Sequence, residues 1–209
     1  MPDDALATLR QRLRSLDAYW AGELDEHLAV AAETRRTLRE DFARLVEICA
    51  RAFADGHKLL IFGNGGSAAD AQHIATEFSV RYRADRRALP ALALTAEGAT
   101  LTAAGNDLGF ERIFARQIEA LGRPGDVAMG ISTSGRSRNV LQGLSQARGQ
   151  GLTAVALGGG DGGELRGLAE PCLIVPSRTV ARIQEMHLAL GQMLCGAVEI
   201  ALGLAGERR

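Results

Sequence analysis

The sequence has few aromatic residues, no excess of positive charge and no long apolar run. Of its 209 residues only 4% are aromatic, and 24 Lys and Arg stand against 25 Asp and Glu, for a net charge of −1. Broad binding of nucleic-acid phosphates needs a basic surface, and base stacking needs aromatic platforms. No apolar stretch approaches the ~20 residues that a membrane-spanning helix requires. We therefore expect no direct nucleic-acid partner and no membrane association.

Cysteine is also scarce. Cys49, Cys172 and Cys195 are odd in number and show no CxxC spacing. We interpret them as buried thiols of a reducing compartment. The first four residues are acidic and lack the apolar core of a signal peptide. Both observations predict a cytoplasmic protein.

The first quarter of the chain has a helical pattern. Apolar residues recur at spacings of three and four from Leu6 to Trp20 and again from Leu38 to Cys49. The plausible breaks are Gly22 and the region of Thr34. Unbroken, residues 1–55 would span ~80 Å at 1.5 Å per residue. We therefore expect a helical arm, residues 1–55, that folds back as a hairpin or reaches a partner chain in an oligomer, followed by one domain, residues 56–209.

Short apolar runs alternate with helical stretches in the rest of the chain. Such strands, separated by helices, are typical of an α/β fold in which a doubly wound parallel sheet is covered on both faces. The predicted strands are residues 58–62, 90–94, 126–131, 152–157 and 172–175, and the predicted helices are residues 68–82, 110–121, 139–148 and 179–204.

The first predicted strand ends in a glycine-rich loop, residues 63–67, that contains Asn64, Gly65, Gly66 and Ser67. Glycine lets the backbone approach a ligand, and the following helix offers free N–H groups. A simple tight turn would have the same composition. The loop lacks the third glycine of GxGxxG and the lysine of a P-loop, so a nucleotide cofactor is not expected.

A second loop, residues 132–137, places four hydroxyls between a strand and a helix. They belong to Ser132, Thr133, Ser134 and Ser137. Hydroxyl donors and the positive end of a helix dipole suit a phosphate group. Helix capping alone would explain one of these residues but not four. We therefore expect a site for a single phosphate on a small polar metabolite.

Two helices carry further polar candidates. His73 and Glu77, four positions apart, share a helix face and could bind a metal or act as a general base, although a routine surface pair is equally consistent. Gln184 and Gln192 are eight positions apart and can also share a face. His187 falls on another face and is expected to be structural. Asn106 and Asp107 precede a predicted helix, as an N-cap or as a contact to a sugar hydroxyl.

These segments together resemble the sedoheptulose-7-phosphate isomerase (phosphoheptose isomerase) family of SIS domain proteins. The match runs from about residue 35 to the C-terminus. It implies a five-stranded, flavodoxin-like parallel sheet, a homotetramer assembled through the N-terminal helices, and interconversion of sedoheptulose 7-phosphate and D-glycero-D-manno-heptose 7-phosphate. That reaction is the first step towards the heptose of lipopolysaccharide. The segments are residues 63–67, 70–73, 106–110, 130–135, 161–163 and 182–185.

The resemblance also implies a role for individual residues. It places the phosphate at the hydroxyl loop and the sugar at the glycine-rich loop. By this resemblance, Ser132, Thr133, Ser134 and Ser137 hold the phosphate; Asn64, Gly65, Gly66, Ser67, Arg81, Asn106, Asp107 and Gln184 contact the substrate; Glu77 transfers the proton; and His73, Glu77, Gln184 and Gln192 occupy the positions of the ligands of a zinc ion seen in some members.

One position departs from the family pattern: its catalytic histidine, also a zinc ligand, is replaced here by Gln192. Glutamine does not titrate near neutral pH, but its amide can donate a hydrogen bond or ligate a metal weakly through oxygen. A sister branch with a similar segment at residues 182–187 is a non-enzymatic tetramer that binds the replication initiator protein. The alternatives to an isomerase are therefore an initiator-binding tetramer or a sugar-phosphate sensor without turnover.

Overall fold

A five-stranded parallel sheet forms the centre of the molecule in the computed structural model, which describes residues 9, 12–13, 16–83 and 85–205. The strand order is β2-β1-β3-β4-β5, and every neighbouring pair is parallel. This order confirms the expected α/β fold with a doubly wound sheet. The strands are β1 (Leu59–Gly63), β2 (Ala91–Ala93), β3 (Val127–Ser132), β4 (Thr153–Gly159) and β5 (Cys172–Val175).

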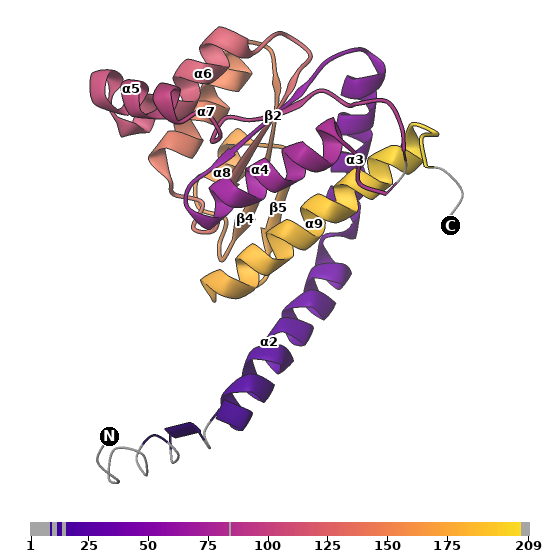
Figure 1. Ribbon diagram of the computed structural model, residues 1–209, viewed down its shortest axis with the longest axis vertical. Coiled ribbons are helices and arrows are strands. Elements are labelled where there is room, and N and C mark those ends of the chain that lie inside the picture. The colour runs from indigo at the N-terminus through magenta and orange to yellow at the C-terminus, as the bar shows by residue number, and fades with distance from the viewer. Residues whose placement is uncertain (1–8, 10–11, 14–15, 84, 206–209) are drawn as a thin grey trace.

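Helices cover both faces of the sheet, as Figure 1 shows. Alternate residues of each strand enter two separate apolar cores: Ile61 and Met129 lie in one, and Leu60 and Ala128 in the other. Burial on both faces explains why the strands read as continuous apolar runs. One layer holds α3 (Arg39–Ala54), α4 (Gly66–Ser79) and α9 (Val180–Ala201); the other holds α5 (Gly98–Leu108), η1 (Phe110–Arg112), α6 (Ile113–Leu121), α7 (Arg138–Gly149) and α8 (Leu165–Leu168).

Helix α5 was not expected from the sequence. Its residues are small and polar, and only Ala104 is buried, so they give no apolar stripe of helical period. The carboxylate of Glu97 begins the helix by accepting from the amides of Ala99 and Thr100. Because α5 extends to Leu108, Asn106 and Asp107 lie in its last turn. The prediction that they cap the next helix is therefore wrong.

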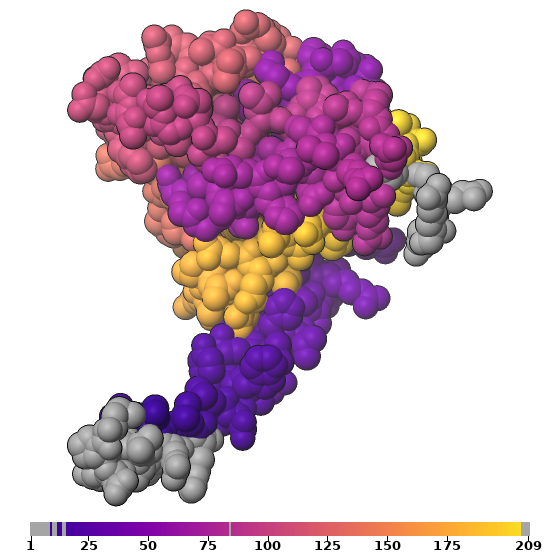
Figure 2. All heavy atoms as spheres, in the orientation of Figure 1, coloured from indigo at the N-terminus to yellow at the C-terminus, as the bar shows by residue number. Residues whose placement is uncertain are grey.

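The N-terminal arm is helix α2 (Leu16–Thr37), which leaves the sheet and extends away from it (Figures 1 and 2). Between α2 and α3 the backbone bonds Leu38 N–H to Thr34 C=O and Phe42 N–H to Leu38 C=O continue, so the two helices form one bent rod. Within the described part of the chain the arm does not fold back as a hairpin. The break lies near Thr34, as expected, whereas Gly22 lies inside α2. The predicted helix over residues 3–15 falls largely outside the described residues.

A polar cluster fastens the arm to the start of α9. Arg182 is only 6% exposed and donates to the carbonyl of Glu23 at 2.7 Å and to the carboxylate of Glu185 at 2.6 Å. Nδ1 of His27 lies 2.8 Å from Glu185, a partner 158 positions away that the sequence around His27 does not reveal. Burial alone would raise the pKa of Glu185, but the bonds from His27 and Arg182 outweigh it and lower that pKa. The arm is therefore positioned by charge pairing as well as by apolar contact.

A buried carboxylate joins β1 and β3 at the edge where these strands begin. Asp126 is 1% exposed and accepts from the backbone amides of Lys58 at 3.0 Å and Arg123 at 2.8 Å, and from the Lys58 ammonium. Burial would raise the pKa of Asp126, but these donors together lower it.

No described helix of the molecule is long and apolar enough to cross a membrane.

We expect Asp126→Asn to destabilise the fold by about 2 kcal/mol at pH 7, because it removes a buried charge-assisted hydrogen bond. The lowered pKa makes this contribution present above the ordinary value of 3.8 and lost as the pH falls through the lowered value. Urea unfolding at pH 7 and at pH 3 should therefore show a smaller difference from wild type at pH 3. Glu47→Gln, at an exposed ion pair, is the control and should change neither curve. An equal difference at both pH values would contradict the assignment.

Candidate functional site

The two predicted loops lie side by side where β1 and β3 end. These strands pair in parallel from Leu59↔Val127 to Gly63↔Ile131, so both chains leave the sheet at one edge. The chain runs from β1 outwards to β2 and from β3 outwards to β4, which makes this the point where the strand order reverses. Ligands of open α/β sheets bind at such a point. The two loops therefore meet as expected, but Glu77, which we expected to converge on the same pocket, lies about 16 Å along α4 from Gly66 in its own chain.

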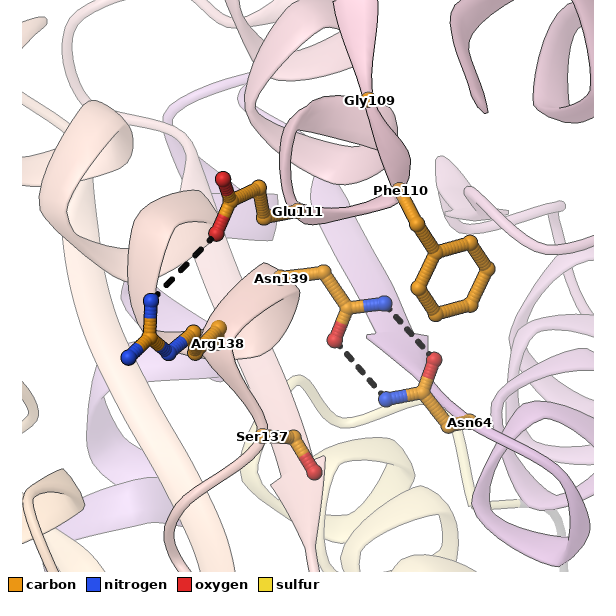
Figure 3. Close-up of a pocket in the computed structure, with 7 residues that line it drawn as sticks. All are labelled: Asn64, Gly109, Phe110, Glu111, Ser137, Arg138 and Asn139. Carbon is orange, nitrogen blue, oxygen red and sulfur yellow. Dashed lines mark hydrogen bonds and ion pairs between the residues drawn. The ribbon is translucent and has the colours of Figure 1, made fainter. Parts of the chain in front are cut away.

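A reciprocal amide pair connects the two loops. Asn64 follows β1, and Asn139 lies in the first turn of α7, just after the hydroxyl loop. The Nδ2 group of each donates to the Oδ1 of the other at 2.8 Å, as Figure 3 shows. Asn139 is buried, with 3% exposure. The amide pair therefore closes the floor between the two strand ends.

A hollow of about 480 Å³ opens above this pair. Phe110 and Glu111 lie on one side of it and the start of α7 on the other (Figure 3). The Phe110 ring is 65% exposed, and Glu111 approaches Arg138 at 3.9 Å. The lining residues are Asn64, Gly109, Phe110, Glu111, Ser137, Arg138 and Asn139.

The hydroxyl loop is held open by its own hydrogen bonds. Ser132 Oγ donates to Ser137 Oγ at 3.1 Å and accepts from the Gly135 amide at 3.2 Å. Ser137 stands at the N-cap of α7, but its side chain does not cap the helix amides. Gly135, at φ +66°, packs so closely on the backbone of Gly162 that a side chain would not fit. The Ser137 hydroxyl thus does not cap α7, and its place beside the positive end of that helix agrees with an anion site.

A second hollow, of about 300 Å³, lies on the β4 side of the same loop. Thr133 and Ser134 line it together with Arg136 and Arg178. Arg136 is bound to Asp161 at 2.6 Å, and this hydrogen bond lowers the pKa of the Asp161 carboxyl. Two guanidinium groups therefore flank the hydroxyl loop, and the charge of one is balanced within the protein.

The predicted titratable pair lies between α4 and α9. Nε2 of His73 is 3.2 Å from Oε1 of Glu77 and 3.3 Å from the amide of Gln192. The His73 side chain is 41% exposed and that of Glu77 23%. Solvent and small molecules can therefore reach this cluster.

Buried groups fix the last turn of α4 beneath Glu77. Arg86 donates to the carbonyl of Glu77 at 2.8 Å and to that of Phe78 at 2.8 Å. Its guanidinium also pairs with Glu199 of α9 at 2.9 Å, and both side chains are 2% exposed. The backbone that carries Glu77 is therefore tied to α9.

Gln184 contacts the glycine-rich loop. A Cβ atom on Gly66 would lie 3.0 Å from Cδ and 3.3 Å from Oε1 of Gln184, so the absence of a side chain at Gly66 makes room for this amide. Gln184 and Gln192 thus both face α4, at Gly66 and at His73, as their spacing predicted. Helix α9 connects the glycine-rich loop with the His73 cluster.

Other predicted residues lie farther from the two hollows within one chain. Glu77 is about 16 Å along α4 from Gly66, at 1.5 Å per residue, and lines neither hollow. Arg81 is exposed just beyond the other end of α4. Asn106 donates to Asp107 at 2.7 Å on the exposed last turn of α5. Ser67 is buried in the first turn of α4.

The remaining histidine and cysteine predictions agree with the structure. His187 is fully buried, with Nε2 2.9 Å from the carbonyl of Gly158, and burial lowers its pKa to about 4. It is a structural histidine. Cys49 and Cys195 are buried free thiols, and Cys172 is partly buried. Burial raises the pKa of Cys49 to about 12 and that of Cys172 to about 11.

The strand order and the strand-end hydroxyl loop define a class of protein, the SIS domain proteins, and the family model of the SIS domain matches residues 24–159. Within that class the chain belongs to the phosphoheptose isomerase family. It is 58% identical to the phosphoheptose isomerase of Paramagnetospirillum magneticum over 85% of this chain and 92% of that protein. It is 47% identical to the phosphoheptose isomerase of Trichlorobacter lovleyi over 93% of this chain and 100% of that protein.

Solved structures agree with this assignment. The phosphoheptose isomerase of Neisseria gonorrhoeae superposes with a TM-score of 0.84 at 38% identity, covering 88% of this chain and 99% of that one. The phosphoheptose isomerase of Francisella tularensis superposes with a TM-score of 0.81 at 34% identity, covering 90% of this chain and 98% of that one. The fold and family that the resemblance implied are thus confirmed.

Several residues that line the hollows were not among the predicted site residues, and Asn139 and Arg178 are two of them. Asn139 lies two positions after Ser137, and an Asn in the first turn of a helix has no sequence feature that separates it from an ordinary helix-start residue. Arg178 lies just before α9, outside either loop, and lines the second hollow only because β4 and α9 come together. Its position follows from tertiary packing.

Proposed function

We propose that the protein is an isomerase that interconverts sedoheptulose 7-phosphate and D-glycero-D-manno-heptose 7-phosphate. The observation that carries the proposal is the hydroxyl loop beside the glycine-rich loop at the β1/β3 edge, in a chain of the phosphoheptose isomerase family. This site suits a phosphorylated sugar, whose phosphate and hydroxyl groups need donors at two neighbouring loops. The reaction class is the conversion of an aldose into a ketose.

The phosphate would bind at the N-terminus of α7. Thr133, Ser134 and Ser137 offer hydroxyls there, and the helix adds partial positive charge. The sugar would extend to the glycine-rich loop, where Gln184 lies against Gly66. These contacts would orient the substrate without taking part in bond making.

Glu77 would carry out the proton transfer. Because it lies about 16 Å along α4 from Gly66 of its own chain, it would act on a substrate bound at the loops of a neighbouring chain of the proposed tetramer. Its carboxylate would remove the proton from the carbon next to the carbonyl, giving an enediol, and return it to the neighbouring carbon. The hydroxyl proton would move to the former carbonyl oxygen in the same interconversion. Gln192, which faces His73 at 3.3 Å, would donate a hydrogen bond to the oxygen on which charge develops.

We expect Glu77→Gln to lower kcat by about 10²- to 10⁴-fold, because the variant loses its general base. To measure kcat, the aldose phosphate that forms from sedoheptulose 7-phosphate is quantified by chromatography. Titration calorimetry should show that the variant still binds the substrate. Glu119→Gln, on the exposed face of α6, is the control and should retain wild-type turnover. Wild-type turnover in Glu77→Gln would contradict the assignment.

We also propose a zinc ion at the His73 cluster. Ligand atoms about 2.0–2.1 Å from a tetrahedral zinc lie about 3.3 Å apart, which matches the spacings of 3.2 and 3.3 Å around His73 Nε2. Among the described residues no three His, Cys, Asp or Glu side chains gather at one point, so amide oxygens would have to complete the set. Gln192 can do so by turning its amide, and Gln184 would first have to leave Gly66.

When bound, zinc would polarise the substrate oxygens as a Lewis acid. Imidazole and carboxylate are strong zinc ligands, whereas a glutamine amide is a weak one. Zinc affinity should therefore be limited by position 192.

We expect Gln192→His to raise zinc affinity by about tenfold or more, because an imidazole replaces an amide as ligand. Competition with a fluorescent chelator measures the affinity, and elemental analysis gives the zinc content. Gln146→His, on α7, is the matched control and should bind zinc like wild type. Equal zinc affinity in wild type and Gln192→His would rule out this cluster as the site.

We propose a homotetramer assembled through the arm. Along α2, Leu16, Tyr19, Trp20, Leu24 and Leu28 are exposed, with Trp20 at 69%. Figure 2 shows the N-terminal part of α2 projecting beyond the rest of the molecule. Exposed apolar stripes of this kind mark association surfaces. Beside the stripe, a mostly apolar hollow of about 940 Å³ lies between α2, α3 and α9, lined among others by Ala31, Leu38, Phe42, Met186, Leu190 and Met193.

We expect light scattering to give wild-type protein a mass about four times the 22.1 kDa of one chain. The double variant Trp20→Glu, Leu24→Glu should give smaller species, because burying two carboxylates without partners opposes association. Asp25→Ala on the same helix is the control and should keep the wild-type mass. A wild-type mass of one chain, or an unchanged mass in the double variant, would contradict the proposal.

We further propose that the protein acts in the cytoplasm, where sugar phosphates are made. An initiator-binding tetramer and a non-catalytic sugar-phosphate sensor remain predictions from the sequence. Gln192 at the position of the family's catalytic histidine favours these alternatives, whereas Glu77, which an isomerase needs and they do not, lies against His73 and favours an isomerase.

A further inference from the structure

Asn139 is a buried residue at the centre of the site that the proposed reaction leaves without a role. Its side chain makes three hydrogen bonds: it donates to Asn64 Oδ1 at 2.8 Å, accepts from Asn64 Nδ2 at 2.8 Å and accepts from the Val140 amide at 2.9 Å. A surface or capping residue would not need this set. Both the oxygen and the nitrogen of the Asn139 amide are therefore hydrogen-bonded. Two of the three bonds go to Asn64 of the glycine-rich loop.

The Val140 amide fixes which way both side chains point. A reciprocal pair of amides can be drawn in two ways, with every oxygen and nitrogen exchanged. A backbone N–H can only donate, so the atom facing Val140 must be the oxygen of Asn139. Its Nδ2 then faces the oxygen of Asn64, and the Asn64 nitrogen is turned to Asn139.

This leaves Asn64 with one free N–H and one free oxygen lone pair. Asn64 lines the hollow of about 480 Å³ that opens between the two loops, as Figure 3 shows. A bound sugar hydroxyl would therefore meet a donor and an acceptor whose directions are set beforehand. Preorganised hydrogen-bonding groups of this kind lose little entropy on binding.

We propose that Asn139 is a positioning residue that holds the Asn64 side chain for the sugar and couples the glycine-rich loop to the hydroxyl loop. Asn139 itself does not touch the substrate. The inference rests on the proposed isomerase function and on its sugar site. It makes the orientation of a β1-end residue depend on a residue of α7.

A double-mutant cycle tests the coupling. The variants are Asn64→Ala, Asn139→Ala and the double variant, with kcat and KM measured for sedoheptulose 7-phosphate. We expect each single variant to lower kcat/KM by about tenfold, as for the loss of one oriented hydrogen bond. The double variant should be no worse than Asn64→Ala, because Asn139 acts only through Asn64. Effects that multiply would overturn the proposal.

Asn139→Asp removes the hydrogen bond that Asn139 donates to Asn64 and keeps the bonds that it accepts. The carboxylate still accepts from Val140 and from Asn64 Nδ2, and an acidic residue in the first turn of α7 suits the helix dipole, so the variant should fold. It can no longer donate to Asn64 Oδ1. We expect a lowered thermal stability, because the carboxylate is buried and one of its oxygens opposes Asn64 Oδ1, and a kcat/KM lowered about tenfold only where Asn64 is present. The same loss in the Asn64→Ala background would instead indicate direct repulsion of the phosphate and overturn the proposal.

Gln117→Ala is the matched control. Gln117 is another buried amide, 7% exposed and bonded to the carbonyls of Leu94 and Ile113. Gln117→Ala should lower thermal stability about as much as Asn139→Ala does. Any effect of Gln117→Ala on kcat/KM should multiply with the effect of Asn64→Ala, because the two residues are not coupled. If wild type does not convert the substrate at all, the proposed function fails and this inference with it. If wild type is active and the effects of Asn139→Ala and Asn64→Ala on kcat/KM multiply, only the positioning role of Asn139 fails.

Discussion

The parallel pairing of β1 with β3 is the constraint on which the site depends. Five residue pairs in register bring Gly63 level with Ile131, so the chain leaves both strands at one edge. The strand order reverses there, and the following helices diverge to opposite faces of the sheet. Neither loop alone offers both hydroxyl donors and close backbone approach. A register shift of one residue would turn the strand ends to the other face and separate them.

Helix α9 is the second organising element, because it contacts each functional part of the chain. Its first turns hold the arm through Arg182, and Gln184 fills the space above Gly66. Two turns further on Gln192 meets His73, and Glu199 closes the end of α4 through Arg86. The arm, the glycine-rich loop and the His73 cluster are therefore linked through one helix.

The sequence predicted the sheet well because strands buried on both faces give unbroken apolar runs and glycine marks their ends. It also predicted that Gln184 and Gln192 share a face, since helical spacing fixes that directly. It could not predict α5, whose mostly small or polar residues carry no apolar period. Because α5 was missed, the N-cap role suggested for Asn106 and Asp107 is wrong. The Asn64–Asn139 pair joins residues 75 positions apart, and only the β1–β3 pairing brings them together. Local pattern thus reveals elements, whereas partners across the sheet come from topology.

The placement of acids and amides divides the chemistry between α4 and α9. On α9 the carboxylates of Glu185 and Glu199 are bound to Arg182 and Arg86, so neither is free to exchange protons with a ligand. What α9 presents to α4 is two amides, which orient and donate but do not titrate. The titratable pair, His73 and Glu77, lies wholly on α4. Glutamine at position 192 therefore leaves the titratable side chains of this cluster on α4, beside an amide presented by α9.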